Sequence, residues 1–155
     1  MTDSARHRSM TSSRMKLLRL AALLLPLACS SATSPAGDPS VQFVLSPARY
    51  SPLTEGAAAQ ATRGTIEVAG DIVTGNPCVD VRGQVDRAAR RFSITVIARQ
   101  QNVGCVQVVA DFAYRATIDG LEAGTYEVVV AHASEDPAGT RRAVRQVLAT
   151  SVVVP

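Results

Sequence analysis

The 155-residue chain has a formal net charge of +3 and contains no tryptophan. Its length leaves room for one domain and a short leader and excludes a second domain. Five of the sixteen basic residues precede Cys29, together with a single acid, so residues 30–155 carry eleven basic and twelve acidic side chains and a formal net charge of −1. The positive charge therefore belongs to the leader, and it gives no support to nucleic-acid binding.

The leader has the three parts of a secretion signal, which are a basic start, an apolar run and small residues at a cleavage site. Residues 15–19 supply the basic start, and residues 20–28 supply the apolar run and its small end. That run is shorter than the roughly 20 residues that cross a bilayer. We expect residues 1–28 to be a signal peptide, and the candidate initiators are Met1, Met10 and Met15.

The leader ends in Leu-Pro-Leu-Ala-Cys, with the cysteine at Cys29. This stretch resembles the lipobox of bacterial lipoproteins, although Pro26 stands where leucine is usual. The resemblance implies that Cys29 receives diacylglycerol, and a multi-chain lipid anchor holds a protein stably on a membrane. Ser30 in place of aspartate implies the outer membrane of a diderm cell, facing the periplasm or the surface. The alternative is a plain secretory signal cut near Ala28 or Ala32.

The remaining cysteines are even in number once Cys29 is lipidated, and exported chains fold in an oxidising compartment. A hairpin made of residues 78–86 and 91–99 would bring Cys105 back to the end of the domain where Cys78 lies. We expect one disulfide between Cys78 and Cys105, with free or metal-binding thiols as the alternative.

The rest of the chain begins with a flexible tether and continues as strands. Residues 29–40 are small and polar and contain proline, which is typical of a tether, so the folded domain is expected over residues 41–155. Alternating apolar residues separated by turn signals predict about seven strands. They are expected within residues 41–45, 65–69, 78–86, 91–99, 105–118 with a bend near Ala113, 125–133 and 142–154. Residues 48–63, which include a run of alanines, are interpreted as a loop.

The sharpest local motif is Leu-Glu-Ala-Gly-Thr-Tyr-Glu-Val-Val-Val, which starts at Leu121. It resembles the Leu-x-x-Gly-x-Tyr-x-Val-x-Val pattern of immunoglobulin-like, fibronectin type III-like and transthyretin-like bacterial domains. The resemblance implies an antiparallel β-sandwich in which Tyr126, with Gly124 and Leu121, forms a structural tyrosine corner. This architecture serves many functions and identifies no ligand.

No residue pattern points to catalysis, a cofactor or a metal. His132 is the only histidine after the leader, and it shares the inward parity of the strand, which favours a structural role over a catalytic one. The carboxylates are scattered and do not form a calcium-loop pattern. Glu135 and Asp136 lie in a predicted hairpin turn, where a solvated turn is favoured over a weak cation site.

The sequence therefore predicts a non-catalytic, membrane-tethered binding or adaptor module of the cell envelope. Its expected partners are the membrane, through the lipid anchor, and another envelope protein, but not nucleic acid. The alternative is a small inhibitor or protector of an envelope enzyme, which would insert the loop of residues 100–104 into an active-site cleft. A third hypothesis, an enzyme that uses the scattered carboxylates, has no obvious catalytic residue.

Overall fold

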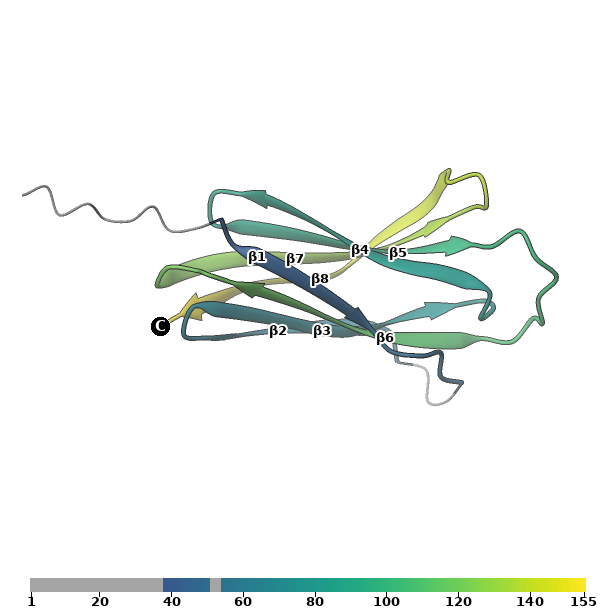
Figure 1. Cartoon of the computed structure of the whole chain (residues 1–155), viewed down its shortest axis with the longest axis horizontal. Coiled ribbons are helices and arrows are strands. Elements are labelled where there is room, and N and C mark those ends of the chain that lie inside the picture. The colour runs from purple at the N-terminus through teal and green to yellow at the C-terminus, as the bar shows by residue number, and fades with distance from the viewer. Residues whose placement is uncertain (1–37, 51–53) are drawn as a thin grey trace, which may run out of the picture. The chain divides into compact units, whose positions relative to one another are not determined.

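The computed structural model describes residues 38–50 and 54–155, which lie in one compact unit, Pro35–Pro155 (Figure 1). The predicted signal peptide and lipidation site, Cys29, lie outside the described residues, as does most of the predicted tether. In the part of the chain that is described, no helix is long and apolar enough to cross a membrane.

Eight strands form two sheets of four, which confirms the β-sandwich and adds one strand to the predicted number. The first sheet has the order β1 (Ser40–Leu45), β6 (Ala110–Asp119), β3 (Thr65–Thr74) and β2 (Gly56–Thr62). The second has the order β4 (Val79–Ala88), β5 (Arg91–Gln100), β7 (Gly124–Glu135) and β8 (Arg141–Val154).

One strand pair departs from the antiparallel arrangement expected for the whole sandwich. β5 and β7 are parallel, whereas the other pairs within the sheets are antiparallel. Parallel neighbours need a crossover connection, because a tight hairpin reverses the chain. Here the crossover is β6, since the chain leaves β5, runs back through the opposite sheet and returns as β7.

β2 is a strand that the sequence did not predict. Residues 48–63 were interpreted as a loop, and this interpretation is wrong for Gly56–Thr62. This strand pairs with β3 and turns Ala57, Ala59 and Ala61 towards the core. Alanine has a weak strand preference and small bulk, so the alternation produces no contrast between large apolar and polar residues. β6 differs in the other direction, because it starts at Ala110 and leaves residues 105–109 outside the strand.

The inward rows of the two sheets fill one continuous core. Its largest fully buried side chains include Phe92, Ile94 and Val96 from β5 and Ile66 and Ile118 from the opposite sheet. These positions follow the alternation in the sequence, because successive residues of a strand point to opposite faces. The period-2 pattern therefore identifies the core in β3, β5, β6 and β7.

The strand registers define two ends of the sandwich, which we call the near end and the far end. The near end holds the start of β1, the β4–β5 turn and the C-terminus (Figure 1). The far end holds the β3–β4 turn, the β7–β8 turn and the connection from Gln100 to Ala110. The chain therefore enters the domain at the near end, and the connection between β5 and β6 projects from the far end.

The ring of Phe43 in β1 packs against the backbone of Gly83 in β4 and so links the edge strands of the two sheets. Phe43 of β1 packs flat on Tyr114 with ring centroids 5.9 Å apart, and its edge lies over Gly83 of β4. Any Cβ atom at Gly83 would collide with the Phe43 ring. Glycine is therefore required at this position for packing, although its neighbours in β4 follow the usual alternation.

Candidate functional site

The near end contains the predicted tyrosine motif, and its side chains are structural. The Tyr126 hydroxyl donates to the Glu122 carbonyl oxygen at 3.0 Å, and its ring packs on Phe92 at a centroid distance of 5.9 Å. Leu121 is buried, and Gly124 has a φ of 151°, a conformation that side chains rarely adopt. This geometry is that of a tyrosine corner, and it commits the hydroxyl proton of Tyr126 to the Glu122 carbonyl oxygen.

The basic hairpin tip at the near end also packs against the core. The guanidinium carbons of Arg87 and Arg90 lie 5.9 and 5.6 Å from the ring centroids of Phe92 and Tyr126. A cation over an aromatic face is stabilising at such distances. These arginines therefore cover the end of the core.

At the far end, Cys78 and Cys105 form the predicted disulfide, with their Cα atoms 6.0 Å apart. The Gln101 amide also donates to the Cys78 carbonyl oxygen at 3.0 Å, one step beyond the β4–β5 pairing. The two links tie the start and the middle of the 101–109 connection to the start of β4.

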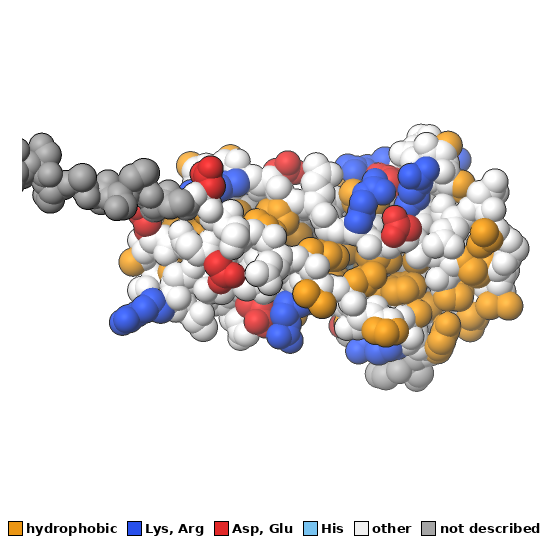
Figure 2. Space-filling model, viewed as in Figure 1, with side chains coloured by type: hydrophobic (Ala, Val, Ile, Leu, Met, Phe, Trp, Pro, Cys, Tyr) orange, Lys and Arg blue, Asp and Glu red, His pale blue; other side chains and the backbone are white. Residues whose placement is uncertain are grey.

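The 101–109 connection exposes four valines, which we call the valine loop. Figure 2 shows hydrophobic side chains gathered at this right-hand end of the molecule. Single exposed apolar side chains are ordinary, but contiguous patches mark interaction surfaces. The members of the valine loop are Val103, Val106, Val108 and Val109.

The carboxylates beside the β7–β8 turn form ion pairs with arginines. Glu135 is buried and pairs with Arg82 at 2.7 Å, and Asp136 pairs with Arg142 at 2.9 Å. The Thr140 amide donates to Asp136, which lowers the pKa of that carboxyl. Within residues 38–50 and 54–155, no three metal-ligating side chains converge.

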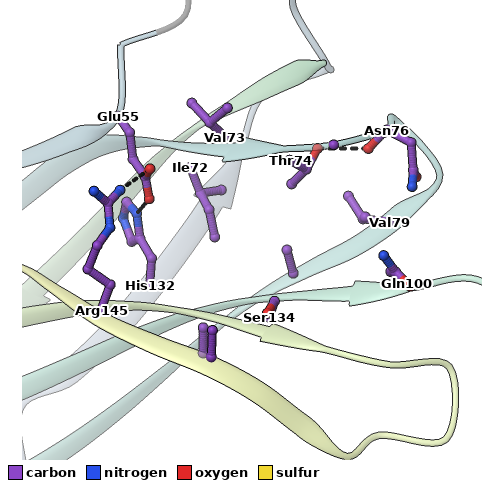
Figure 3. Close-up of a pocket in the computed structure, with 14 residues that line it drawn as sticks. Glu55, Ile72, Val73, Thr74, Asn76, Val79, Gln100, His132, Ser134 and Arg145 are labelled. Atoms are coloured by element: carbon purple, nitrogen blue, oxygen red, sulfur yellow. Dashed lines mark hydrogen bonds and ion pairs between the residues drawn. The ribbon is translucent and has the colours of Figure 1, made fainter. Parts of the chain in front are cut away.

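The side chain of His132 in β7 links the two sheets near the far end through hydrogen bonds. Its Nδ1 lies 2.7 Å from Glu55 Oε1 (Figure 3). Its Nε2 lies 2.9 Å from the Tyr114 hydroxyl. Burial lowers the pKa of His132 to about 4, while the negative charge of Asp71 acts in the opposite direction. The neutral imidazole therefore donates from Nδ1 to Glu55 and accepts from Tyr114.

The carboxylate, imidazole and phenol stand in the order that activates a nucleophile in some enzymes. Here Tyr114 is 3% exposed, and burial raises the pKa of its phenol. Gly70 makes room for the hydroxyl, because a Cβ atom at that position would overlap it. The arrangement keeps the phenol protonated and links β6, β7 and the residue before β2, which is a structural function.

A second polar cluster joins the β1–β2 connection to β3 and β6. Arg49 pairs with Asp71 and lies 2.5 Å from Asp111 Oδ2, and the Asp111 side chain is 1% exposed. Backbone bonds between Arg49 and Asp111 add to this contact. Among the described residues, Asp111 Oδ1 has no hydrogen-bond partner.

A pocket of about 310 Å³ lies between the two sheets at the far end, beside His132 (Figure 3). Its walls come from β3, β5, β7, β8 and the start of β4, and the Glu55–Arg145 ion pair lies at one side. The inward position of His132 could be read from the sequence. Glu55, Tyr114 and Arg145 were missed, because they lie far apart in the sequence and carry no spacing signal.

Comparison with known proteins supports the architecture. Residues 67–141 match the family model of the ORF11 beta-sandwich domain. The match runs from β3 to the first residue of β8, so it includes His132 and both disulfide cysteines but neither Glu55 nor Arg145. No curated protein and no solved structure matches the chain.

Proposed function

We propose that this protein is a non-catalytic binding or adaptor module, tethered by a lipid to the cell envelope, and that it binds a partner protein through its far end. The observation that carries the proposal is the valine loop, which lies at the end of the sandwich opposite the start of β1. A tether that enters at the near end leaves the far end free to reach a partner.

The chemistry of the valine loop favours an apolar protein surface as the partner. Val106 is 68% exposed and Val103 is 58% exposed, so both expose apolar surface that a partner could bury. The outer face of β4 offers no such surface, because its exposed side chains are charged or polar (Asp80, Arg82, Gln84 and Asp86). Protein interfaces bury their apolar centre and leave polar groups at the rim.

The disulfide supports the same proposal, because it fixes the loop before a partner arrives. A flexible loop loses conformational entropy when it is ordered on binding, and a constrained loop loses less. Cys105 lies between Val103 and Val106, so the crosslink constrains the loop at its centre.

Partner binding is tested by co-purification from envelope extracts with immobilised Pro35–Pro155, which contains the whole core. The Val103→Ser/Val106→Ser variant should recover at least about tenfold less of a specific partner, since each serine removes buried apolar area. Val153→Ser is the matched control, because Val153 is 66% exposed at the near end. Equal recovery by all three proteins would contradict the proposal.

The tether is tested separately by incorporation of radiolabelled palmitate into the full chain. We expect label in the wild-type protein and none in Cys29→Ala, because the acyl chains are attached at that cysteine. Fractionation should then release Cys29→Ala from the membrane, since stable anchoring requires more than one acyl chain. Equal labelling of both proteins, or none in either, would remove the lipid anchor from the account.

A second candidate function is inhibition or protection of an envelope enzyme by the loop of residues 100–104. The contact that favours it is the double link of this loop to Cys78, through the Gln101 amide and the disulfide. Inhibitory loops act in such constrained conformations. The test compares proteolysis by envelope proteases with wild-type protein and with a variant that lacks Asn102 and Val103, and identical rates with and without wild-type protein would exclude this function.

A further inference from the structure

The pocket at the far end exists because the side chains in the inward rows of three strands become smaller or more polar there. Towards the near end these rows carry Phe, Ile and Val, whereas at the pocket they carry small or polar residues apart from Ile72. The change occurs on both sheets, so the space between them is left unfilled. The inward residues that line the pocket from β3, β5 and β7 are Ile72, Thr74, Ala98, Gln100, His132 and Ser134.

The pocket has an apolar interior. Ile72 and Val79 contribute the larger apolar side chains, and alanines of β5, β7 and β8 complete the wall (Figure 3). Its volume of about 310 Å³ lies at the lower end of the range for small-molecule sites. Such sites combine apolar walls with a few polar groups that orient the ligand. The occupant that matches is a small molecule with an apolar body.

The uncharged polar side chains around the pocket can form hydrogen bonds with a ligand. The side-chain amide of Gln100 and the hydroxyl of Ser134 line the pocket, and each can both donate and accept a hydrogen bond. The Asn76 side-chain oxygen accepts from the Cys78 amide at 3.0 Å, which leaves the NH₂ group of Asn76 as a donor. A ligand therefore finds both donors and acceptors among these side chains, so they do not by themselves select its polar group.

The two charged groups at the side of the pocket, Glu55 and Arg145, balance in formal charge but differ in the hydrogen bonds that they have left to offer. Glu55 is engaged on both oxygens, by His132 and by Arg145. His132 is neutral at pH 7, so it adds no charge to this wall. Arg145 uses one nitrogen on Glu55, its side chain is 61% exposed, and a guanidinium has five N–H donors in a fork that fits a carboxylate. The remaining donors of Arg145 are the strongest polar feature of the pocket.

We propose that the far-end pocket binds a small amphipathic carboxylic acid. The apolar body lies between the sheets against Ile72 and Val79, and the carboxylate accepts hydrogen bonds from Arg145 at the rim. This site is independent of the valine loop, because it lies between the sheets and would take a small molecule, whereas the loop would contact a protein surface.

Isothermal titration calorimetry of Pro35–Pro155 with octanoate tests the proposal, with octylamine and octanol as probes of matched chain length. Octanoate should bind with a dissociation constant of about 1 mM or lower, as expected for a ligand of its size. Octylamine should bind at least about tenfold more weakly, because its ammonium group cannot accept the hydrogen bonds that Arg145 donates. Equal affinity for all three probes would contradict the carboxylate assignment, and no octanoate binding at about 10 mM would contradict the site.

Two pairs of variants locate the site. Ala143→Phe places a ring at the wall of the pocket and should weaken octanoate binding at least about tenfold, whereas Ala149→Phe on an exposed position of the same strand should leave it unchanged. Arg145→Gln should weaken octanoate about tenfold and octanol less than twofold. Arg142→Gln is its control, since Arg142 pairs with Asp136 in the β7–β8 turn.

Thermal unfolding of each variant keeps these results interpretable, since a variant that retains a cooperative transition is folded. Octanoate should also raise the melting temperature of the wild-type protein, because a ligand that binds only the folded state stabilises it. If folded Ala143→Phe and Ala149→Phe bind octanoate equally, the ligand binds elsewhere and the proposal is wrong. Loss of octanoate binding with retained partner recovery would separate this site from the proposed adaptor function.

Discussion

The two ends of the sandwich are stabilised in different ways. At the near end the core is filled by Phe92 and Tyr126, and the tyrosine hydroxyl is satisfied by a carbonyl four residues earlier. At the far end most of the inward residues that line the pocket are small or polar, and the links are a disulfide and the Glu55–His132–Tyr114 hydrogen bonds. Packing of aromatic rings stabilises the near end, whereas a covalent bond and hydrogen bonds between buried polar side chains link the strands of the far end.

The far end should depend on its covalent link. The Cys78→Ala/Cys105→Ala variant should lose roughly 3–4 kcal/mol of unfolding free energy, because the crosslink closes a loop with a sequence separation of 27. Urea denaturation measures the loss, and reduction of the wild-type protein should reproduce it. Chemical-shift changes should concentrate at the far end, and a loss below about 1 kcal/mol would show that the disulfide contributes little.

The buried histidine should make the stability of the far end depend on pH. Above pH 6.5 the imidazole is neutral in both states, and between pH 6.5 and about 4 only the unfolded chain takes up the proton. The stability is therefore fully present above pH 6.5 and is lost as the pH falls towards 4. His132→Asn should remove about 2 kcal/mol of the decrease between pH 7 and pH 5, measured by urea denaturation, and parallel pH profiles for the two proteins would contradict this.

Removal of each of the two buried tyrosine hydroxyls, one at either end, should give the smallest changes in unfolding free energy. Tyr126→Phe should cost about 1 kcal/mol, since it removes one hydrogen bond to a carbonyl. Tyr114→Phe should cost about 1 kcal/mol more, because it leaves the buried Nε2 of His132 without its partner. Thermal and urea unfolding of the pair measure the difference, and equal costs would mean that the far-end hydrogen bonds are no more demanding than those of the near end.

The features that follow from local alternation and turn chemistry could be predicted from the sequence. The cores of β4, β5 and β7 coincide with the predicted strands, because large apolar residues alternate with polar ones there. The disulfide was predictable too, since the hairpin geometry brings Cys78 and Cys105 to one end of the domain. In each case the information lies within a strand or between neighbouring strands.

The features that depend on contacts between distant strands could not be predicted in this way. β2 pairs through its backbone and small alanines, so its sequence gave no contrast, and the parallel pairing of β5 and β7 depends on the path of β6. The pocket lies where side chains such as those of Ala98 and Ser134 are too small to fill the space between the sheets. Glu55 contacts His132 although the two residues are 77 positions apart in the sequence. A periodic pattern detects large side chains and does not detect the space they leave.

The central claim is that the far end is the binding end, and site-specific photo-crosslinking in intact cells tests it most directly. A photoreactive residue replaces Val106 at the far end or Val153 at the near end, positions with nearly equal exposures of 68% and 66%. The account predicts one discrete crosslinked protein from position 106 and none from position 153. Crosslinks of equal yield from both positions, or from position 153 alone, would contradict it.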